Sequence, residues 1–161
     1  IQATPPETLA RLLLPFLKKS GFHAEPGEFL VKVVKTLVQR SKTLEEMALA
    51  ATFYFAETIS CEEKAARKCL KPAARKPLQL LMDALGAIET FTEKNLENAF
   101  KSVMEKTGLK LGKIAQPVRV ALTGKTASPG IFEITEIIGK EKVIQRLKQA
   151  VDYIEQAKEK E

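Results

Sequence analysis

The sequence contains few of the residues that build metal centres and nucleophilic sites. Among its 161 residues there are only two cysteines, Cys61 and Cys69, and one histidine, His23. A structural zinc site needs four Cys or His ligands at short spacings, so these residues cannot assemble one. No Ser or Cys context points to His23 as a catalytic base, and its place between Gly21 and Pro26 favours a surface or loop histidine. We expect the two cysteines to be reduced and structural.

Long apolar runs are missing as well. No stretch approaches the roughly 20 apolar residues that a membrane-spanning helix requires. The first 20 residues also lack the charged-then-apolar layout of a signal peptide. We therefore expect a cytoplasmic protein with no membrane partner. The chain begins at Ile1 rather than Met, which suggests a piece of a longer protein.

Alternation of apolar and polar residues, the pattern of a half-buried strand, does not occur over a useful length. Helical spacing recurs instead, and it is clearest between Val143 and Ile154. We expect an all-α protein of two small helical subdomains, 1–66 and 67–161, divided near the basic and proline-interrupted stretch "RKCLKPAARKP". Helices are expected over about 4–19, 27–40, 43–56, from 60, and over 77–88, 92–106, 110–122 and the C-terminal stretch, with caps at Thr4, Thr43 and Ser60.

Positive charge exceeds negative charge. There are 26 Lys and Arg against 20 Asp and Glu, a net charge of +6. This favours an anionic partner without proving one. The basic stretch from Arg67 to Lys76 can contact phosphates or can simply be solvated. The run Phe53-Tyr54-Phe55 can stack on bases, but at consecutive helical positions at least one ring faces the core, so packing is favoured.

The stretch "RVALTGKTASPGIFE", residues 119–133, contains Thr-Gly-Lys-Thr and so resembles the end of a phosphate-binding loop. Such a loop needs a glycine five residues before the Gly-Lys pair, because both glycines let the backbone curl around phosphates. That position is Arg119. The sequence therefore favours a helix that stops at Gly124.

The C-terminal half, "KLGKIAQPVRVALTGKTASPGIFEITEIIGKEKVIQRLKQAVDYI", together with the upstream "QRSKTLEEMA" and "LKPAARKPL", resembles the anticodon-binding region of bacterial-type glutamyl-tRNA synthetases. The resemblance covers nearly the whole chain in one order. It implies two helical subdomains that form an anticodon-binding helical cage, with the anticodon loop of tRNA(Glu) as partner. The parent would be a class I aminoacyl-tRNA synthetase that uses ATP and Mg and joins glutamate to its tRNA.

The same resemblance implies site residues. The family's Ser/Thr-Pro element falls on Ser128 and Pro129, with Ile131 at the apolar position beyond; in the family this loop and helix start contact the first two anticodon bases. Its Gln-Pro-(apolar)-Arg pattern falls on Gln116 and Arg119, which are implied to face the RNA. Family members vary between Gly124 and Ser128, so no specific contact is assigned there. The arginine that precedes the family's Thr-Leu element falls on Arg40, which is implied to read the third anticodon base.

Two expectations concern what this chain does not do alone. The His-Ile-Gly-His-like and Lys-Met-Ser-Lys-Ser-like motifs of the family's catalytic half do not occur here. We expect no catalytic residue, no bound metal and no cofactor in this chain, no ligase activity by the chain alone, and the catalytic domain of the same parent as a partner. The rival interpretation is a helical protein-interaction scaffold whose basic surface is incidental.

Overall fold

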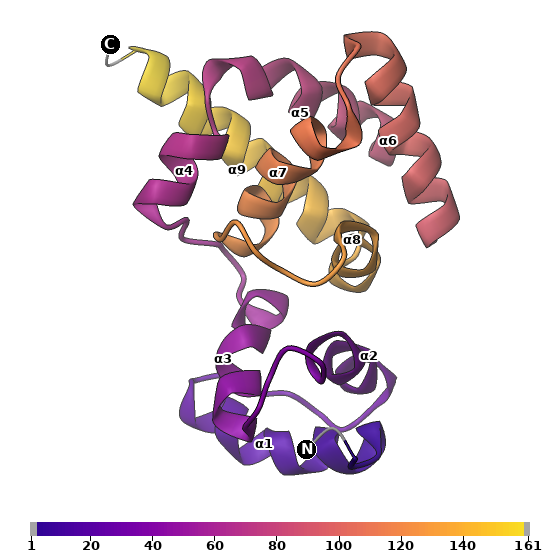
Figure 1. The fold of residues 1–161 in the computed structure, drawn as a ribbon, viewed down its shortest axis with the longest axis vertical. Coiled ribbons are helices and arrows are strands. Elements are labelled where there is room, and N and C mark those ends of the chain that lie inside the picture. The colour runs from indigo at the N-terminus through magenta and orange to yellow at the C-terminus, as the bar shows by residue number, and fades with distance from the viewer. Residues whose placement is uncertain (1–2, 160–161) are drawn as a thin grey trace. The chain divides into compact units, whose positions relative to one another are not determined.

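A computed structural model describes residues 3–159, with side chains to residue 157. The expected all-α fold is confirmed, since this described part contains helices and no strand (Figure 1). None of its helices combines the length and apolar character needed to cross a bilayer. The helices are α1 (Pro6–Lys19), α2 (Glu28–Leu37), α3 (Leu44–Phe55), α4 (Glu63–Cys69), α5 (Pro72–Gly86), α6 (Glu93–Thr107), α7 (Leu111–Thr123), α8 (Ile131–Ile138) and α9 (Lys140–Glu159).

The chain forms two compact units, Ile1–Glu57 and Thr58–Glu161. The sequence suggested a division at 66/67, which falls inside α4. The difference has a physical cause. Pro72 does not break the chain but begins α5, where the missing N–H of proline costs nothing. The preceding helix, α4, packs against α7, so it belongs to the second unit.

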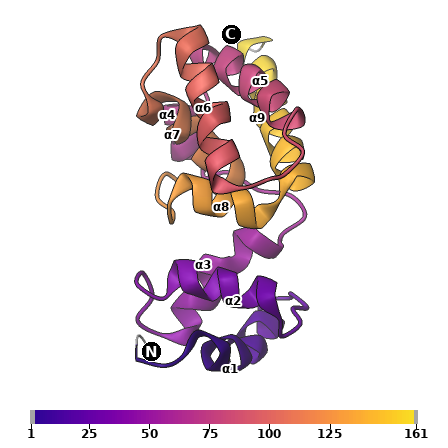
Figure 2. The same cartoon turned by 90° about the vertical axis from the view of Figure 1, so that its right-hand side faces the viewer.

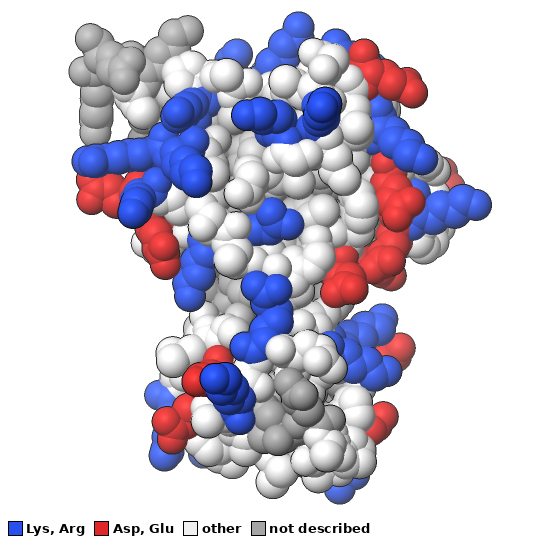
Figure 3. Space-filling model, in the orientation of Figure 1, with Lys and Arg blue, Asp and Glu red and all other residues white. Residues whose placement is uncertain are grey.

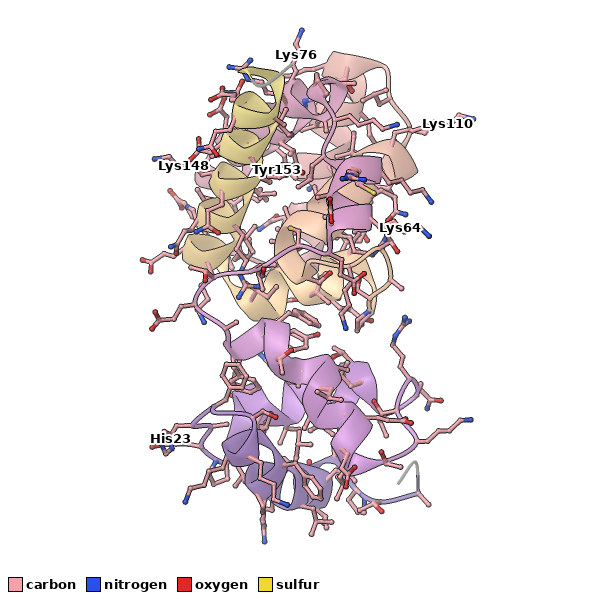
Figure 4. All side chains as sticks on the ribbon, turned by 90° about the vertical axis from the view of Figure 1, so that its left-hand side faces the viewer. His23, Lys64, Lys76, Lys110, Lys148 and Tyr153 are labelled. Carbon is pink, nitrogen blue, oxygen red and sulfur yellow. The ribbon has the colours of Figure 1, made fainter. Side chains whose placement is uncertain are left out.

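In the first unit, α1, α2 and α3 pack against one another. The aromatic run of α3 serves packing, as the sequence favoured: Tyr54 is 1% exposed, and its hydroxyl lies 2.8 Å from Oγ1 of Thr36. The Phe55 ring meets the rings of Phe22 and Phe29 at centroid distances of 6.3 and 5.6 Å. His23 is exposed between α1 and α2 and projects from the unit, as expected (Figure 4). The buried core consists mainly of Leu9, Leu13, Leu17, Leu30, Val33, Val34, Leu37, Met47, Ala51 and Tyr54.

In the second unit, the long helix α9 packs against α5, α7 and α8, while α6 packs against α5, α7 and α8 (Figure 2). The apolar stripe of α9 that the sequence predicted is buried, so α9 forms one side of this core. Burying a large apolar side chain contributes about 1.5–3 kcal/mol. The core includes Leu78, Leu81, Leu85, Leu96, Phe100, Ile114, Val118, Leu122, Ile134, Val143, Leu147 and Ile154.

One of the three predicted helix caps is confirmed, and a second threonine caps its helix without having been predicted to do so. Thr43 accepts a hydrogen bond at Oγ1 from the backbone N–H of Glu46 at 3.1 Å, and Thr92 accepts one from the N–H of Asn95 at 3.3 Å. Each hydroxyl satisfies an N–H that has no partner inside its helix.

The other two predicted caps are wrong. The residue preceding α1 is Pro5 rather than Thr4, and α4 is preceded by Glu62 rather than Ser60. In both cases the helix begins later than the sequence indicated. For α4 the reason is tertiary, because the segment around Ser60 packs against the end of α7.

Candidate nucleic-acid interface

The structure at the end of α7 shows whether the Thr-Gly-Lys-Thr stretch is a phosphate-binding loop or a helix end. Gly124 follows the helix with φ of +80°, and its N–H donates to the carbonyl of Val120 at 2.8 Å. This left-handed conformation favours glycine, because a side chain would crowd the backbone. The predicted helix end is confirmed, so the glycine closes a helix rather than opening a phosphate-binding loop.

Gly124 is also held from outside the helix. A Cβ atom added to it would lie 2.8 Å from the carbonyl oxygen of Ser60, and its own carbonyl accepts the N–H of Glu62 at 3.0 Å. The Cys61 thiol donates to the carbonyl of Val120 at 3.5 Å, and its burial raises the pKa of the thiol. The segment before α4 therefore fixes the point from which the loop to α8 departs.

Arg146, on the neighbouring helix α9, also holds the C-terminal end of α7. Its side chain is 1% exposed, and Nη1 donates at 2.8 Å to the carbonyl of Leu122, one of the last carbonyls of α7. Burial lowers the pKa of Arg146 to about 10, so the group is still charged at neutral pH. A cation at the C-terminal end of a helix is stabilised by the helix dipole. Sequence reasoning missed this residue, because its spacing in α9 matches an ordinary apolar position.

Thr123 is a second anchor that the sequence did not single out. Its hydroxyl donates to the carbonyl of Arg119 at 2.8 Å and accepts the N–H of Lys125 at 3.1 Å. The hydroxyl thus ties the first residue of the loop to the last turn of α7. The Thr-Gly pair in the sequence was the available signal, since both residues act on this helix end.

Three of the site residues implied by the sequence form one hydrogen-bonded group. Arg119 donates from Nε to Oγ of Ser128 at 2.8 Å and from Nη1 to Oε1 of Gln116 at 2.8 Å. The Ser128 hydroxyl in turn donates to the carbonyl of Pro129 at 2.7 Å. Gln116, Arg119 and Ser128 are each half-buried. The guanidinium of Arg119 therefore joins Gln116, from the helix motif of the sequence, to Ser128, from the loop motif.

The arrangement suits recognition of planar polar groups. Two hydrogen bonds fix the plane of the Arg119 guanidinium, which offers donors in a rigid fork and carries a permanent charge. Such a group can bind a phosphate or stack on and hydrogen-bond an unpaired base. A reactive chemical step has no support here, because this group contains neither a nucleophile activated by a base nor a pair of carboxylates.

Ile131 and Pro129 differ from what the resemblance implied. Both are buried, and Ile131, the first residue of α8, is only 7% exposed. In this structure Ile131 is part of the apolar core and presents little surface to a base. The cause is α8 itself, which buries one face that begins at Ile131 and continues through Ile134. The role of these two residues in RNA contact stays a prediction.

Arg40 belongs to the first unit, whereas the other five residues belong to the second. Its helix, α2, ends at Leu37, three residues earlier than the sequence suggested. The backbone N–H of Arg40 donates to the carbonyl of Leu37 at 3.0 Å, and its side chain is exposed. An exposed arginine on a turn after a helix end is accessible to a ligand.

Comparison with known families gives a direct match. The model of the family described as "Anticodon binding domain" matches residues 8–151. Curated relatives include the glutamate–tRNA ligase of Desulfosudis oleivorans, 48% identical over 157 residues, and that of Geobacter sulfurreducens, 46% identical over 156 residues. These alignments cover 98% and 97% of this chain but 34% of each relative. The chain thus spans about a third of the length of these relatives.

Solved structures agree on the fold. The crystal structure of a glutamate tRNA ligase from Elizabethkingia meningosepticum, in complex with its amino acid, superposes with a TM-score of 0.78 over 93% of this chain and 31% of that chain. A glutamate-tRNA synthetase from Elizabethkingia anophelis gives a TM-score of 0.79. The identities are 24% and 23%, so these two likenesses concern the arrangement of the helices.

Proposed function

Since the chain belongs to the anticodon-binding domain family of glutamate–tRNA ligases, we propose that it binds the anticodon loop of tRNA(Glu). We assign the contact to Gln116, Arg119 and Ser128, which are half-buried, and keep the neighbouring Pro129 and Ile131, which are buried, as predicted contacts. Arg40, in the first unit, is assigned a separate contact with the third anticodon base. The observation that carries the proposal is the shared guanidinium: Arg119 contacts both Gln116 and Ser128 at 2.8 Å.

The chemistry of the site supports an RNA ligand. An anticodon is a single-stranded loop with unpaired bases, and proteins read such bases by hydrogen bonds to their edges and by stacking on planar side chains. A guanidinium held in one plane loses little conformational freedom when it binds a base or phosphate. Gln116, which already accepts from Arg119, keeps amide N–H donors for a base acceptor.

The wider role follows from the proposal. In the parent ligase, the catalytic domain would attach glutamate to the tRNA that this chain holds, with ATP and Mg bound to that domain. This chain would contribute binding energy and anticodon specificity without taking part in the reaction. We place the ligase in the cytoplasm, where tRNA is charged and used.

Binding of an anticodon hairpin tests the proposal at the residue that carries it. We expect Arg119→Ala to weaken binding of a hairpin with the tRNA(Glu) anticodon about tenfold or more, since one charge-assisted hydrogen bond contributes about 1.5–3 kcal/mol. The matched control is Arg75→Ala, which removes an exposed arginine of the same unit that pairs with Glu155. Equal losses of affinity for both variants would mean that binding depends only on net charge, and would contradict the assignment of Arg119 to the site.

A further inference from the structure

A groove in the second unit adjoins the Arg119 group. It has a volume of about 340 Å³ and lies where the end of α4 and the start of α5 face the first half of α7. Gln116 lines it, and Oε1 of the same residue accepts from Arg119 at 2.8 Å. The groove is therefore continuous with the proposed anticodon surface through one side chain.

The groove carries positive charge on both walls. Lys68 of α4 and Lys71, the residue before α5, line one wall, and Lys113 of α7 lines the other. All three lysines are exposed, and none of them forms an ion pair with a carboxylate of the described residues. Two nearby arginines behave differently, because Arg67 pairs with Glu63 and Arg75 pairs with Glu155.

The surroundings of the groove strengthen this charge. Lys64 of α4 and Lys110, which precedes α7, extend to the same side of the unit (Figure 4). On the face drawn in Figure 3, Lys and Arg side chains lie over α4 and α7, while acidic side chains of this unit lie mainly at the margins. The N-terminus of α7 opens at the groove without a side-chain cap. A helix N-terminus adds partial positive charge.

We propose that this groove seats backbone phosphates of the RNA strand next to the anticodon, with Lys68, Lys71 and Lys113 as their partners. The inference rests on the proposed function, since it takes the ligand of the Arg119 group to be RNA. Phosphate contacts position a nucleic acid and carry no sequence information, whereas base contacts supply specificity. The lysines would hold the strand in register, and Gln116 and Arg119 would meet the bases.

Salt dependence separates the two roles. Each lysine that neutralises a phosphate releases counterions on binding, so removing it lowers the slope of log affinity against log salt by about 1. We expect the double variant Lys68→Gln/Lys113→Gln to lower the slope of hairpin binding by about 2. It should weaken hairpins with the glutamate anticodon and with a scrambled anticodon by the same factor, because phosphates are common to both.

The matched control is Lys94→Gln/Lys148→Gln, which removes the same charge from exposed lysines of α6 and α9 outside the groove. This control should keep the slope of the unaltered chain, and circular dichroism should show unchanged helicity for both variants. Equal slopes for the groove and control variants would overturn the proposal that the groove binds phosphates. A preference of the unaltered chain for the glutamate anticodon would in that case leave the proposed function standing. If the groove variant lowers the slope but the unaltered chain shows no anticodon preference, the phosphate role of the groove stands and the proposed anticodon recognition is overturned. Absence of binding to either hairpin by the unaltered chain would overturn both proposals.

Discussion

Arg119 of α7 donates from Nε to the hydroxyl oxygen of Ser128, in the loop before α8, at 2.8 Å. This one hydrogen bond joins the helix element and the loop element of the proposed interface. It also aims the guanidinium, because Nη1 is held at the same time by Gln116. The proposed interface therefore depends on a helix and a loop that pack together before any ligand arrives.

Removing the hydroxyl tests whether this positioning matters. Ser128→Ala takes away the acceptor of Arg119 Nε and should weaken binding of the glutamate anticodon hairpin by about 1 kcal/mol, or roughly fivefold. The fold should be unaffected, since Ser128 is only half-buried. Ser20→Ala, at an exposed serine after α1, serves as the control in the same titration. An unchanged affinity in Ser128→Ala would mean that the serine does not position Arg119 for the ligand.

Gly108 and Gly124, which end α6 and α7, offer a matched stability test. Both have positive φ, of +75° and +80°, but only Gly124 has a close neighbour, the Ser60 carbonyl. Alanine at either position costs about 1–2 kcal/mol for the left-handed backbone. Gly124→Ala should cost about 1–3 kcal/mol more, because its Cβ overpacks the segment before α4. Urea unfolding of both variants measures the difference, and equal costs would show that this contact contributes nothing.

Cys61 gives a pH-dependent expectation. Burial raises the pKa of its thiol, so at a given pH less reactive thiolate is present in the folded chain than in the unfolded chain. The stability linked to this shift is present below the unfolded pKa and is lost as pH rises through the folded pKa. We expect slow alkylation of Cys61 in the folded Cys69→Ser variant at pH 8 and faster alkylation of the same variant in urea. Equal rates in the two conditions would contradict the burial of this thiol.

Arg40 is the residue we assign to the third anticodon base. Glutamate and glutamine anticodons differ there, C against G, and the donors of an arginine match the O2 and N3 acceptors of an unpaired cytosine. A guanine would leave a donor unpaired, at a cost of about 1–3 kcal/mol. Arg40→Gln should therefore reduce the ratio of affinities between a hairpin whose anticodon ends in C and one whose anticodon ends in G. The measurement is titration of both proteins with both hairpins at one salt concentration.

The control for Arg40→Gln is Arg11→Gln, at an exposed arginine on α1 of the same unit. This variant should retain the preference, because it changes the net charge equally without altering the assigned contact. If Arg40→Gln weakens both hairpins by one factor, Arg40 contacts phosphate or nothing, and the discrimination needs another residue.

Local chemistry made much of the fold predictable. Thr43 caps α3 and Gly124 ends α7, as hydrogen bonding and φ preference alone required. The division between the units was not predictable in this way, since a proline and a basic stretch are equally compatible with a helix start. Pro72 proved to be the first residue of α5.

The proposed interface was predictable in composition but not in detail. The helical spacing of Ile131, Ile134 and Ile138 agrees with a buried face, whereas the family pattern assigned Ile131 to the RNA. Nothing in residue spacing shows that Arg146 reaches the end of α7 from another helix, because that contact arises from long-range packing. The contact between Arg119 and Ser128 is of the same kind. A family pattern could name both residues, but only the folded chain shows that they touch.

The most direct test of anticodon recognition compares two RNA hairpins of identical stem and length that differ only in the three anticodon bases. One hairpin carries the glutamate anticodon and the other a scrambled anticodon, and the unaltered chain is titrated with each at one fixed salt concentration. If the chain reads bases, the glutamate hairpin should bind at least about tenfold more tightly, since each mismatched contact costs about 1–3 kcal/mol. Equal affinities for the two hairpins would contradict anticodon recognition and leave only sequence-independent binding of a basic surface to RNA.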